Sequence, residues 1–282
     1  MLGSELFIQF NKIKKNTVRG SARSKDQLIL HPFKKFKIYK NIDFDISAFN
    51  FDKVQKKIKE FNPDYLINCI GVIKQKINKL SNYKDIIYIN SILPHKLHSL
   101  TNSLNIRLIH FSTDCVFDGK KGGYLETSKP NAKDLYGISK YWGEINSHNS
   151  LTIRTSIIGH EFGSKKGLLE WFINKRKECN GYTNSFFSGV TTFEVFKFIN
   201  NCVFKKKKIS GLIHLYSSKI SKFNLLKLIA KIYKKNIVIK KDNHFKINRS
   251  LNSKYLRNNF RYKVPNWSNM IKKMLSNHKF VN

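Results

Sequence analysis

The feature that most constrains this 282-residue chain is the alternation of short apolar runs with longer stretches of helical periodicity. Residues 65–70 and 106–111 are nearly continuous apolar runs, which suits parallel strands buried on both faces. Residues 49–61 and 84–100 have the spacing of helices, and residues 151–154 form a further apolar run. This alternation predicts an α/β fold in which a parallel sheet carries helices on both faces.

Composition places the chain among globular proteins, with 41% hydrophobic residues and a length that allows a sizeable core. No apolar run approaches the roughly 20 residues that a membrane-spanning helix needs. The first residues show no basic segment ahead of an apolar core, so no signal peptide is predicted. We therefore expect a cytoplasmic protein without membrane insertion.

The net charge of +35 raises the question of a nucleic-acid partner. Only eight of the 53 basic residues are Arg, the side chain best suited to phosphates and bases. The lysines are spread along the chain, with one dense run at 205–208. This pattern indicates compositional bias, so a nucleic-acid partner is not expected, although the positive field would attract anionic substrates.

The four cysteines give no sign of a metal site. They stand at positions 69, 115, 179 and 202, too far apart for a CxxC pair. The sequence therefore predicts neither a bound metal nor a disulfide.

A stretch with catalytic potential runs from residue 106 to residue 146. Its apolar run ends in Ser112, Thr113 and Asp114, and Tyr136 and Lys140 follow at the start of a helical pattern. Residues four apart share one face of a helix, so the ammonium of Lys140 is expected to lie beside the phenol of Tyr136. A neighbouring positive charge lowers the pKa of a phenol, which is otherwise near 10. A hydroxyl at the end of the adjacent strand would hold a carbonyl against this phenol, and together they would form a general acid or base.

The spacing alone is weak evidence, because isolated Tyr–Lys pairs are common on helix surfaces. The surrounding residues strengthen it. The segments FSTDCVFDG at 111–119 and YGISKYWGE at 136–144 resemble the extended short-chain dehydrogenase/reductases. Within that family they are most similar to the dTDP-4-dehydrorhamnose reductase group. The resemblance implies a catalytic triad of Thr113, Tyr136 and Lys140.

The resemblance also implies two lobes. Residues 1–156 would form a Rossmann-like domain that binds NADP(H), and residues 157–282 would mainly form a smaller α/β lobe for substrate. The chain departs from the family at its start, where residues 1–6 open a helix with no strand before it. Gly3 matches the third glycine of the family's GxxGxxG pattern. We expect the first strand and the first two glycines to lie upstream of residue 1, through a misplaced start or a truncated gene.

Several residues are expected to bind the cofactor. In a Rossmann domain an acid after the second strand suits NAD, and an arginine suits NADP. Here Arg19 and Arg23 occur with no acid between them, which favours NADP(H) while leaving NAD(H) open. In the family, residues matching Asp45 and Ile46 frame the adenine. Gly71 follows a strand and would allow close approach of the backbone to a ligand.

The remaining candidates lie closer to the expected reaction centre. Asn90 would support a proton relay behind the lysine, or would simply satisfy backbone groups. Ser112 is expected to contact the cofactor together with Tyr136 and Lys140.

Substrate contacts are expected from four residues. Thr113 would orient the sugar carbonyl, and Lys74 and Gln75 would face a nucleotide sugar. Arg249 would pair with its diphosphate, although a surface salt bridge is an equal alternative. The family often has tryptophan where this chain has Ile157, which leaves the identity of the sugar open.

These observations favour NADP(H)-dependent reduction of a 4-keto group on a nucleotide-activated deoxysugar, used in surface polysaccharide synthesis. An epimerase or dehydratase of the same superfamily is the main alternative, because Asp114 adjoins the catalytic hydroxyl. A non-catalytic regulatory or binding relative is the third hypothesis, since the phosphate-binding glycines are incomplete. A homodimer is compatible with all three.

Overall fold

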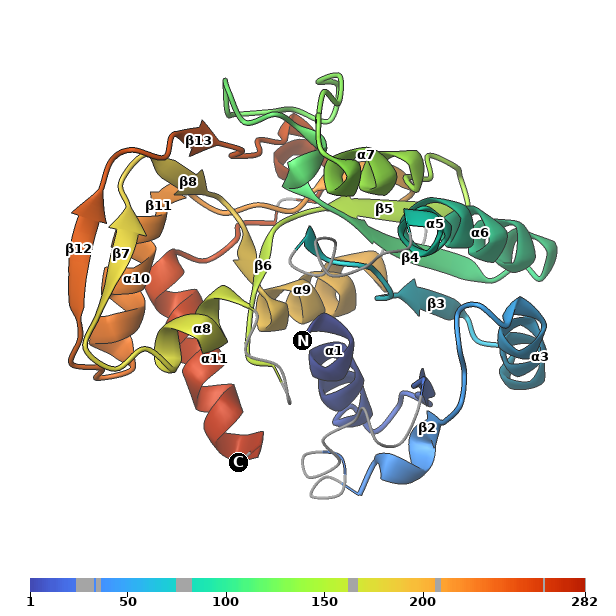
Figure 1. Cartoon of the computed structure of the whole chain (residues 1–282). Coiled ribbons are helices and arrows are strands. Elements are labelled where there is room, and N and C mark those ends of the chain that lie inside the picture. Colours follow the sequence, from blue (N-terminus) through green and yellow to red (C-terminus); the bar gives the residue numbers. More distant parts are fainter. Residues whose placement is uncertain are drawn as a thin grey trace.

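The main sheet is parallel and runs in the order β10-β5-β4-β3 in the computed structural model (Figure 1). The structure describes residues 1–23, 33, 37–74, 83–161, 167–205, 209–260 and 262–281. The strands of the main sheet are β3 (Tyr65–Asn68), β4 (Arg107–Ser112), β5 (Ser150–Arg154) and β10 (Gly211–His214). Every residue of β4 and β5 is buried, as expected for the middle of a parallel sheet. The predicted α/β fold with a parallel sheet is confirmed.

A second parallel pair lies apart from the main sheet. Strand β1 (Gly20–Ser21) pairs with β2 (Ile42–Asp43), which follows a 3₁₀ turn at Tyr39–Asn41. The main sheet ends at β3, whose first three residues are only partly buried. Within the described residues no strand joins β3 to β1.

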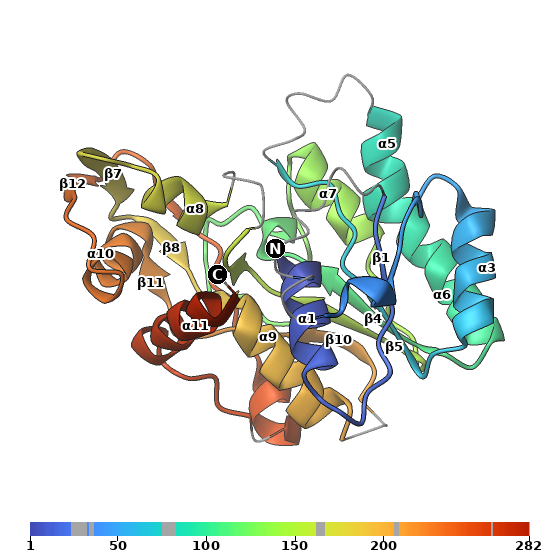
Figure 2. The ribbon, with the colours of Figure 1, turned by 90° about the horizontal axis from the view of Figure 1, so that it is seen from below.

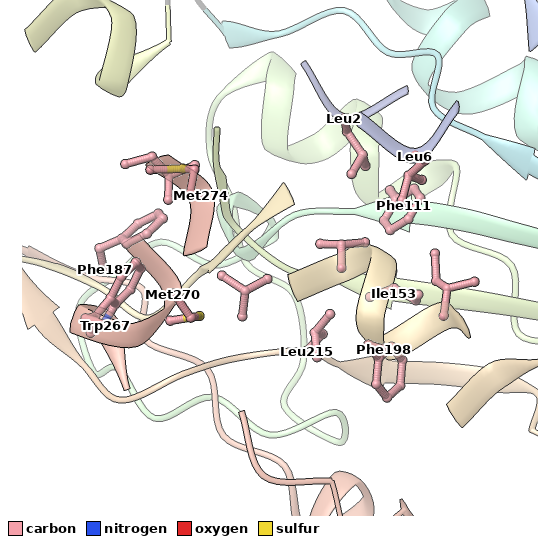
Figure 3. Packing of buried hydrophobic residues seen from close by; sticks show 14 of the residues in the cluster. Leu2, Leu6, Phe111, Ile153, Phe187, Phe198, Leu215, Trp267, Met270 and Met274 are labelled. Carbon is pink, nitrogen blue, oxygen red and sulfur yellow. The ribbon is translucent and has the colours of Figure 1, made fainter. Parts of the chain in front are cut away.

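One face of the main sheet is covered by α1 (Leu2–Asn11) and α9 (Thr192–Phe198), which lie side by side (Figure 2). A π-helical turn, Ile199–Val203, continues α9. Leu2 and Leu6 of α1 point toward Phe111 and Ile153 of the sheet in the largest apolar cluster (Figure 3). Burial of each such side chain stabilises the fold by about 1.5–3 kcal/mol, so this cluster fixes α1 against the sheet.

The other face carries the helices that follow β2, β3 and β4 in sequence. They are α3 (Phe51–Phe61), α5 (Tyr83–Ile87), the π-helical turn Tyr88–Ile92, α6 (Leu93–Ser103) and α7 (Leu135–Trp142). Helix α3 begins at Asn50, whose side chain accepts a hydrogen bond from the Lys53 N–H, and ends at left-handed Asn62. Helices on both faces were predicted from the sequence, and this arrangement is confirmed.

The second lobe, whose α-helices lie on the left in Figure 1, is built from short strands, three α-helices and a π-helical turn at Leu256–Phe260 among the described residues. Its helices are α8 (Leu168–Ile173), α10 (Lys222–Ile232) and α11 (Trp267–Val281). Its strands are β6 (Ile157–Ile158), β7 (Glu178–Tyr182), β8 (Ser185–Phe187), β9 (Val190–Thr191), β11 (Ile220–Ser221), β12 (Val238–Asp242) and β13 (Ile247–Asn248).

Pairing in this lobe is largely between distant segments. Strand β7 pairs with β12, β6 with β9, and β8 lies between β11 and β13. Helix α8 stops at Ile173, and the next residues join β12 as strand β7.

The two lobes meet at the carboxyl end of the main sheet. The loop after β4 bonds to the second lobe through Asn248 N to Gly119 O and Tyr124 N to Ser250 O. Ligands of parallel α/β sheets bind at this end of the strands. The fold therefore places the segment after β4 where a ligand would meet both lobes.

Candidate active site

The chain leaves β4 through a short 3₁₀ turn, Asp114–Val116, that fixes the predicted catalytic hydroxyl. Thr113 caps this turn, because its Oγ1 accepts a hydrogen bond from Cys115 N at 3.1 Å. The same hydroxyl donates to Oδ1 of Asp114 at 3.2 Å. Thr113 and Asp114 are both buried, so the hydroxyl is held in one orientation.

Helix α7 brings the predicted tyrosine to this turn. The side chain of Asp134 caps the helix by accepting a hydrogen bond from Gly137 N at 2.9 Å. Gly137 packs so closely on the turn that an added Cβ would lie 2.2 Å from the carbonyl oxygen of Cys115. This contact needs a glycine, and it places the phenol of Tyr136 near enough to Thr113 for the threonine side chain to lower the pKa of the phenol. The structure therefore brings the predicted hydroxyl and phenol together.

The electrostatic environment of Tyr136 differs from the sequence-based expectation. Burial raises the pKa of the phenol, and the neighbouring Cys115 adds to this effect, whereas the hydrogen bond from Thr113 opposes it. The ammonium of Lys140 donates instead to the carbonyl oxygen of Phe111, at 2.7 Å. In this structure the pKa of Tyr136 is raised instead of lowered, and Lys140 is not among the main groups that shift it. A neutral phenol keeps the proton that a general acid must donate.

Lys140 itself is buried among the elements around the site. Burial lowers the pKa of Lys140 to about 8, and the negative charge of Glu144 counteracts part of the shift. Glu144 follows the end of α7, four residues after Lys140. This spacing in the sequence was a signal for Glu144 that our sequence analysis did not use.

Glu144 belongs to a buried network that the sequence analysis missed. Its carboxylate accepts hydrogen bonds from Arg154 at 2.7 and 2.6 Å and from the Ser112 hydroxyl at 2.6 Å. Arg154 also lies 3.3 Å from the imidazole of His214, at the end of β10. The network ties the ends of β4, β5 and β10 together directly behind the reaction centre. It also occupies the hydroxyl of Ser112, which was expected to contact the cofactor.

The predicted cofactor residues of the first segment surround the start of α1. Gly3 lies against Cys69, which follows β3, with its missing Cβ 3.3 Å from the Cβ of that residue. Arg19 and Arg23 flank β1 and are exposed, and Arg19 donates to the carbonyl oxygen of Lys40 at 3.4 Å. The two arginines thus stand on either side of β1 in the chain, and their role in binding a cofactor stays a prediction.

The next group of predicted cofactor residues follows β2 and β3. Asp45 is exposed with a positive φ of 59°, and Ile46 beside it is buried. Gly71 is exposed, and an added Cβ there would meet only Oδ1 of Asn90, at 3.6 Å. The buried amide of Asn90 bonds to both backbone groups of Val72 and to Ser139. Of the two interpretations of Asn90, these contacts fit the one in which it satisfies backbone groups.

The predicted substrate residues converge on the cap of α7. Lys74 forms an ion pair with Asp134 at 3.0 Å, and Arg249 approaches the same carboxylate at 3.9 Å. Burial raises the pKa of Asp134, but the hydrogen bond from Gly137 and the charge of Lys74 outweigh it, so the pKa is lowered. Gln75 lies outside the described residues.

The donor groups present suit a dinucleotide. The start of α1 offers free backbone N–H groups, and Arg19 and Arg23 offer exposed cations near β1. The buried ammonium of Lys140 lies beside Phe111, near the carboxyl end of β4. The N–H donors and cations near α1 and β1, together with the ammonium beside Phe111, fit a ligand whose phosphate and ribose groups are separated.

A family model for the RmlD substrate-binding domain matches residues 1–280, nearly the whole chain. The chain belongs to this family. Among curated proteins it is 33% identical over 94 residues to a protein of Haloferax volcanii named probable low-salt glycan biosynthesis reductase Agl14, 33% of this chain and 31% of that protein. It is 32% identical over 91 residues to methionine adenosyltransferase 2 subunit beta of Xenopus tropicalis, 32% of this chain and 27% of that protein. The matched segments thus span about a third of these relatives.

Solved structures show the same fold. A dTDP-4-dehydrorhamnose reductase of Bacillus anthracis in complex with NADP gives a TM-score of 0.72 at 20% identity, covering 84% of this chain and 91% of that one. A hypothetical dTDP-4-dehydrorhamnose reductase of Sulfolobus tokodaii gives 0.75 at 20% identity, covering 94% of each. L-threonine 3-dehydrogenase of Trypanosoma brucei gives 0.79 at 15% identity, covering 100% and 95%. These similarities confirm the Rossmann-like fold of the family.

Two further features of the structure concern membranes and metals. Among the described residues, no helix combines the length and apolar character that crossing a bilayer requires. The same residues contain no cluster of three or more His, Cys, Asp or Glu side chains arranged to bind a metal ion.

Proposed function

We propose that this protein reduces a 4-keto group on a nucleotide-activated deoxysugar, using NADP(H), in the synthesis of surface polysaccharide. The observation that carries the proposal is the contact between the Thr113 hydroxyl and the Tyr136 phenol, with Lys140 buried one helical turn further along α7. Family membership and the relative named as a glycan biosynthesis reductase support the same conclusion. The proposal places the enzyme in the cytoplasm, with no nucleic-acid partner and with a homodimer allowed.

Each of the three side chains has a distinct task. The Thr113 hydroxyl would orient the sugar carbonyl, and Tyr136 would donate its proton to the oxygen. The raised pKa of Tyr136 keeps the phenol protonated until charge develops on that oxygen. Lys140 would hold the ribose of the cofactor and would return a proton to the phenolate. A bound reduced nicotinamide supplies the hydride for the carbonyl carbon.

The preference for NADP(H) rests on Arg19 and Arg23, two exposed guanidiniums beside β1. An arginine at this position suits the additional phosphate of NADP. The related solved structures include one complex with NADP and a dTDP-glucose 4,6-dehydratase in complex with NAD. NAD(H) is therefore the competing cofactor in the test below.

A dehydratase or epimerase is the second candidate, and one observation favours it. Asp114 is buried directly beside Thr113, where a second acid would assist elimination chemistry. Such an enzyme would interconvert nucleotide sugars with no net consumption of NADPH. A regulatory subunit would bind ligands without turnover, as the similarity to a protein named as a subunit would allow.

The proposal is tested by titrating NADPH and NADH into the purified chain and following nicotinamide fluorescence. Saturable binding that favours NADPH supports the arginine assignment, and equal or absent binding contradicts it. A Tyr136→Phe variant should bind NADPH nearly as tightly as the wild type and should lose turnover of a 4-keto nucleotide sugar. Full activity in this variant would remove Tyr136 from the mechanism.

A further inference from the structure

His214 is the last residue of β10, and its side chain is fully buried. Its two ring nitrogens contact groups of opposite character. Nδ1 lies 3.1 Å from the carbonyl oxygen of Tyr124 and 3.0 Å from that of Asn252. Nε2 lies 3.3 Å from Nη1 of Arg154. His214 therefore contacts the loop after β4, the second lobe and the buried guanidinium behind the reaction centre.

These partners determine the protonation state of the His214 ring. A carbonyl oxygen only accepts hydrogen bonds, so Nδ1 must carry a proton, and a guanidinium only donates, so Nε2 must carry none. Burial lowers the pKa of His214 to about 4, an effect that Glu126 opposes and Arg154 increases. The imidazole is therefore neutral at pH 7, with Nδ1 as its donor and Nε2 as its acceptor.

Arg154 extends the Nε2 contact to the end of β4. Its Nε and Nη2 donate to the carboxylate of Glu144 at 2.7 and 2.6 Å, and its Nη1 donates to His214. The same carboxylate accepts the hydroxyl of Ser112 at 2.6 Å, and Ser112 directly precedes Thr113. Bidentate pairing of a guanidinium with a carboxylate fixes the orientation of both groups. A buried hydrogen-bonded chain thus runs from His214 to the residue before the proposed carbonyl-binding hydroxyl.

The Nδ1 contacts connect the same ring to the second lobe. Asn252 donates its backbone N–H to the carbonyl oxygen of Tyr124 at 2.8 Å, and Tyr124 forms a parallel bridge with Leu251. The ring of Tyr124 stacks on Phe117, with the ring centroids 4.1 Å apart. The Nδ1–H group of His214 therefore donates where the second lobe is joined to the loop after β4.

We propose that His214 is a positioning residue that couples the second lobe to the catalytic strand, with each ring nitrogen holding one of the two. Nε2 holds Arg154 and, through Glu144, the end of β4, so loss of this contact lowers kcat. Nδ1 holds residues 250–252 of the second lobe, so loss of this contact raises KM for the nucleotide sugar. The inference rests on the proposed function and gives a role in it to a residue that does not touch the substrate.

The test uses two substitutions that each keep one half of the hydrogen bonding of the ring. His214→Asn keeps an N–H donor near the position of Nδ1 and removes the acceptor for Arg154. His214→Gln keeps an amide oxygen near the position of Nε2 and removes the donor to the two carbonyl oxygens. His148→Asn is the control, because His148 is exposed and lies just before β5. Steady-state kinetics with NADPH and a 4-keto nucleotide sugar give kcat and KM, and NADPH affinity checks the fold of each variant.

His214→Asn should lower kcat at least about tenfold with KM nearly unchanged, because a small displacement of reacting groups is costly. His214→Gln should raise KM for the nucleotide sugar and keep most of kcat. His148→Asn should match the wild type. Unchanged kcat and KM in both His214 variants overturn the positioning role alone, and so do equal losses of kcat in both. If the wild type turns over no 4-keto nucleotide sugar, the proposed function fails, and the positioning role fails with it.

A second measurement needs no substitution, so it holds even if a variant fails to fold. In wild-type protein labelled with 15N-histidine, the His214 signals assigned by NMR should show a neutral ring with its proton on Nδ1. The ring should not titrate between about pH 5 and 8, where an unperturbed histidine does. A proton on Nε2, or titration in this range, would break the chain to Arg154 and overturn the inference.

Discussion

Because the ammonium of Lys140 is buried, the free energy of unfolding of this protein should rise as pH increases from about 8 to 10.5. Burial lowers the pKa of Lys140 from 10.5 to about 8. Below about pH 8 the folded protein holds the charged Lys140 ammonium buried, out of contact with water. Between about pH 8 and 10.5 Lys140 is neutral in the folded protein and protonated only in the unfolded chain. A depressed lysine pKa therefore destabilises the fold at neutral pH, and the penalty disappears as pH rises.

The size of the effect follows from the shift. Each pKa unit corresponds to 1.36 kcal/mol, so the penalty is about 3 kcal/mol for a shift from 10.5 to about 8. A Lys140→Met variant lacks the titrating group, so its free energy of unfolding should not rise with pH in this way. The free energy of unfolding of the wild type should therefore rise relative to the variant by about 3 kcal/mol across the window. The hydrogen bond to Phe111 O is lost at every pH, so it adds only a constant offset.

The assay is urea unfolding of wild type and variant at a series of pH values from 7 upward. Lys59→Met is the control, since Lys59 also lies in the last turn of a helix but is exposed. The difference between wild type and this control should stay constant with pH. If the free energies of unfolding of wild type and Lys140→Met, plotted against pH, stay parallel within about 0.5 kcal/mol, the reasoning is refuted.

Three further changes test other parts of the site. Glu144→Gln should lower the free energy of unfolding by about 3–5 kcal/mol in urea titrations, because it leaves the buried guanidinium of Arg154 without its carboxylate; a loss under about 1 kcal/mol would contradict the network. Gly137→Ala should lower both stability, by about 1–3 kcal/mol, and kcat, since its Cβ would lie 2.2 Å from the carbonyl oxygen of Cys115; unchanged kcat would show that α7 tolerates displacement. Arg19→Ser should weaken NADPH binding about tenfold and leave NADH unchanged in fluorescence titrations; equal losses for both cofactors would remove Arg19 from discrimination.

Sequence patterns predicted the parts of this fold that depend on local order. The apolar runs at 65–70 and 106–111 became β3 and β4, and the segment around Tyr136 became a helix beside Thr113. These elements could be predicted because burial on both faces of a parallel strand leaves a continuous apolar run. The candidate catalytic residues were chosen by their spacing and by the resemblance of their segments to a family.

Features that depend on distant pairing could not be predicted in this way. Strands β7 and β12 are 56 or more residues apart and are rich in polar and glycine residues, so each alone lacks a strand pattern. The hydrogen bond from Tyr124 N to Ser250 O depends on how the second lobe packs against the first. The raised pKa of Tyr136 likewise comes mainly from burial, which depends on segments far from it in the sequence. Tertiary contacts decide all three.

The central claim is tested most directly by mixing the purified chain with NADPH and dTDP-4-dehydrorhamnose and following the loss of nicotinamide absorbance. The account predicts NADPH consumption in step with formation of a reduced nucleotide sugar, and no consumption with Tyr136→Phe. Conversion of a nucleotide sugar with no net use of NADPH would contradict a reductase and favour an epimerase or dehydratase. Tight NADPH binding with no turnover of any 4-keto nucleotide sugar would contradict catalysis by Thr113, Tyr136 and Lys140.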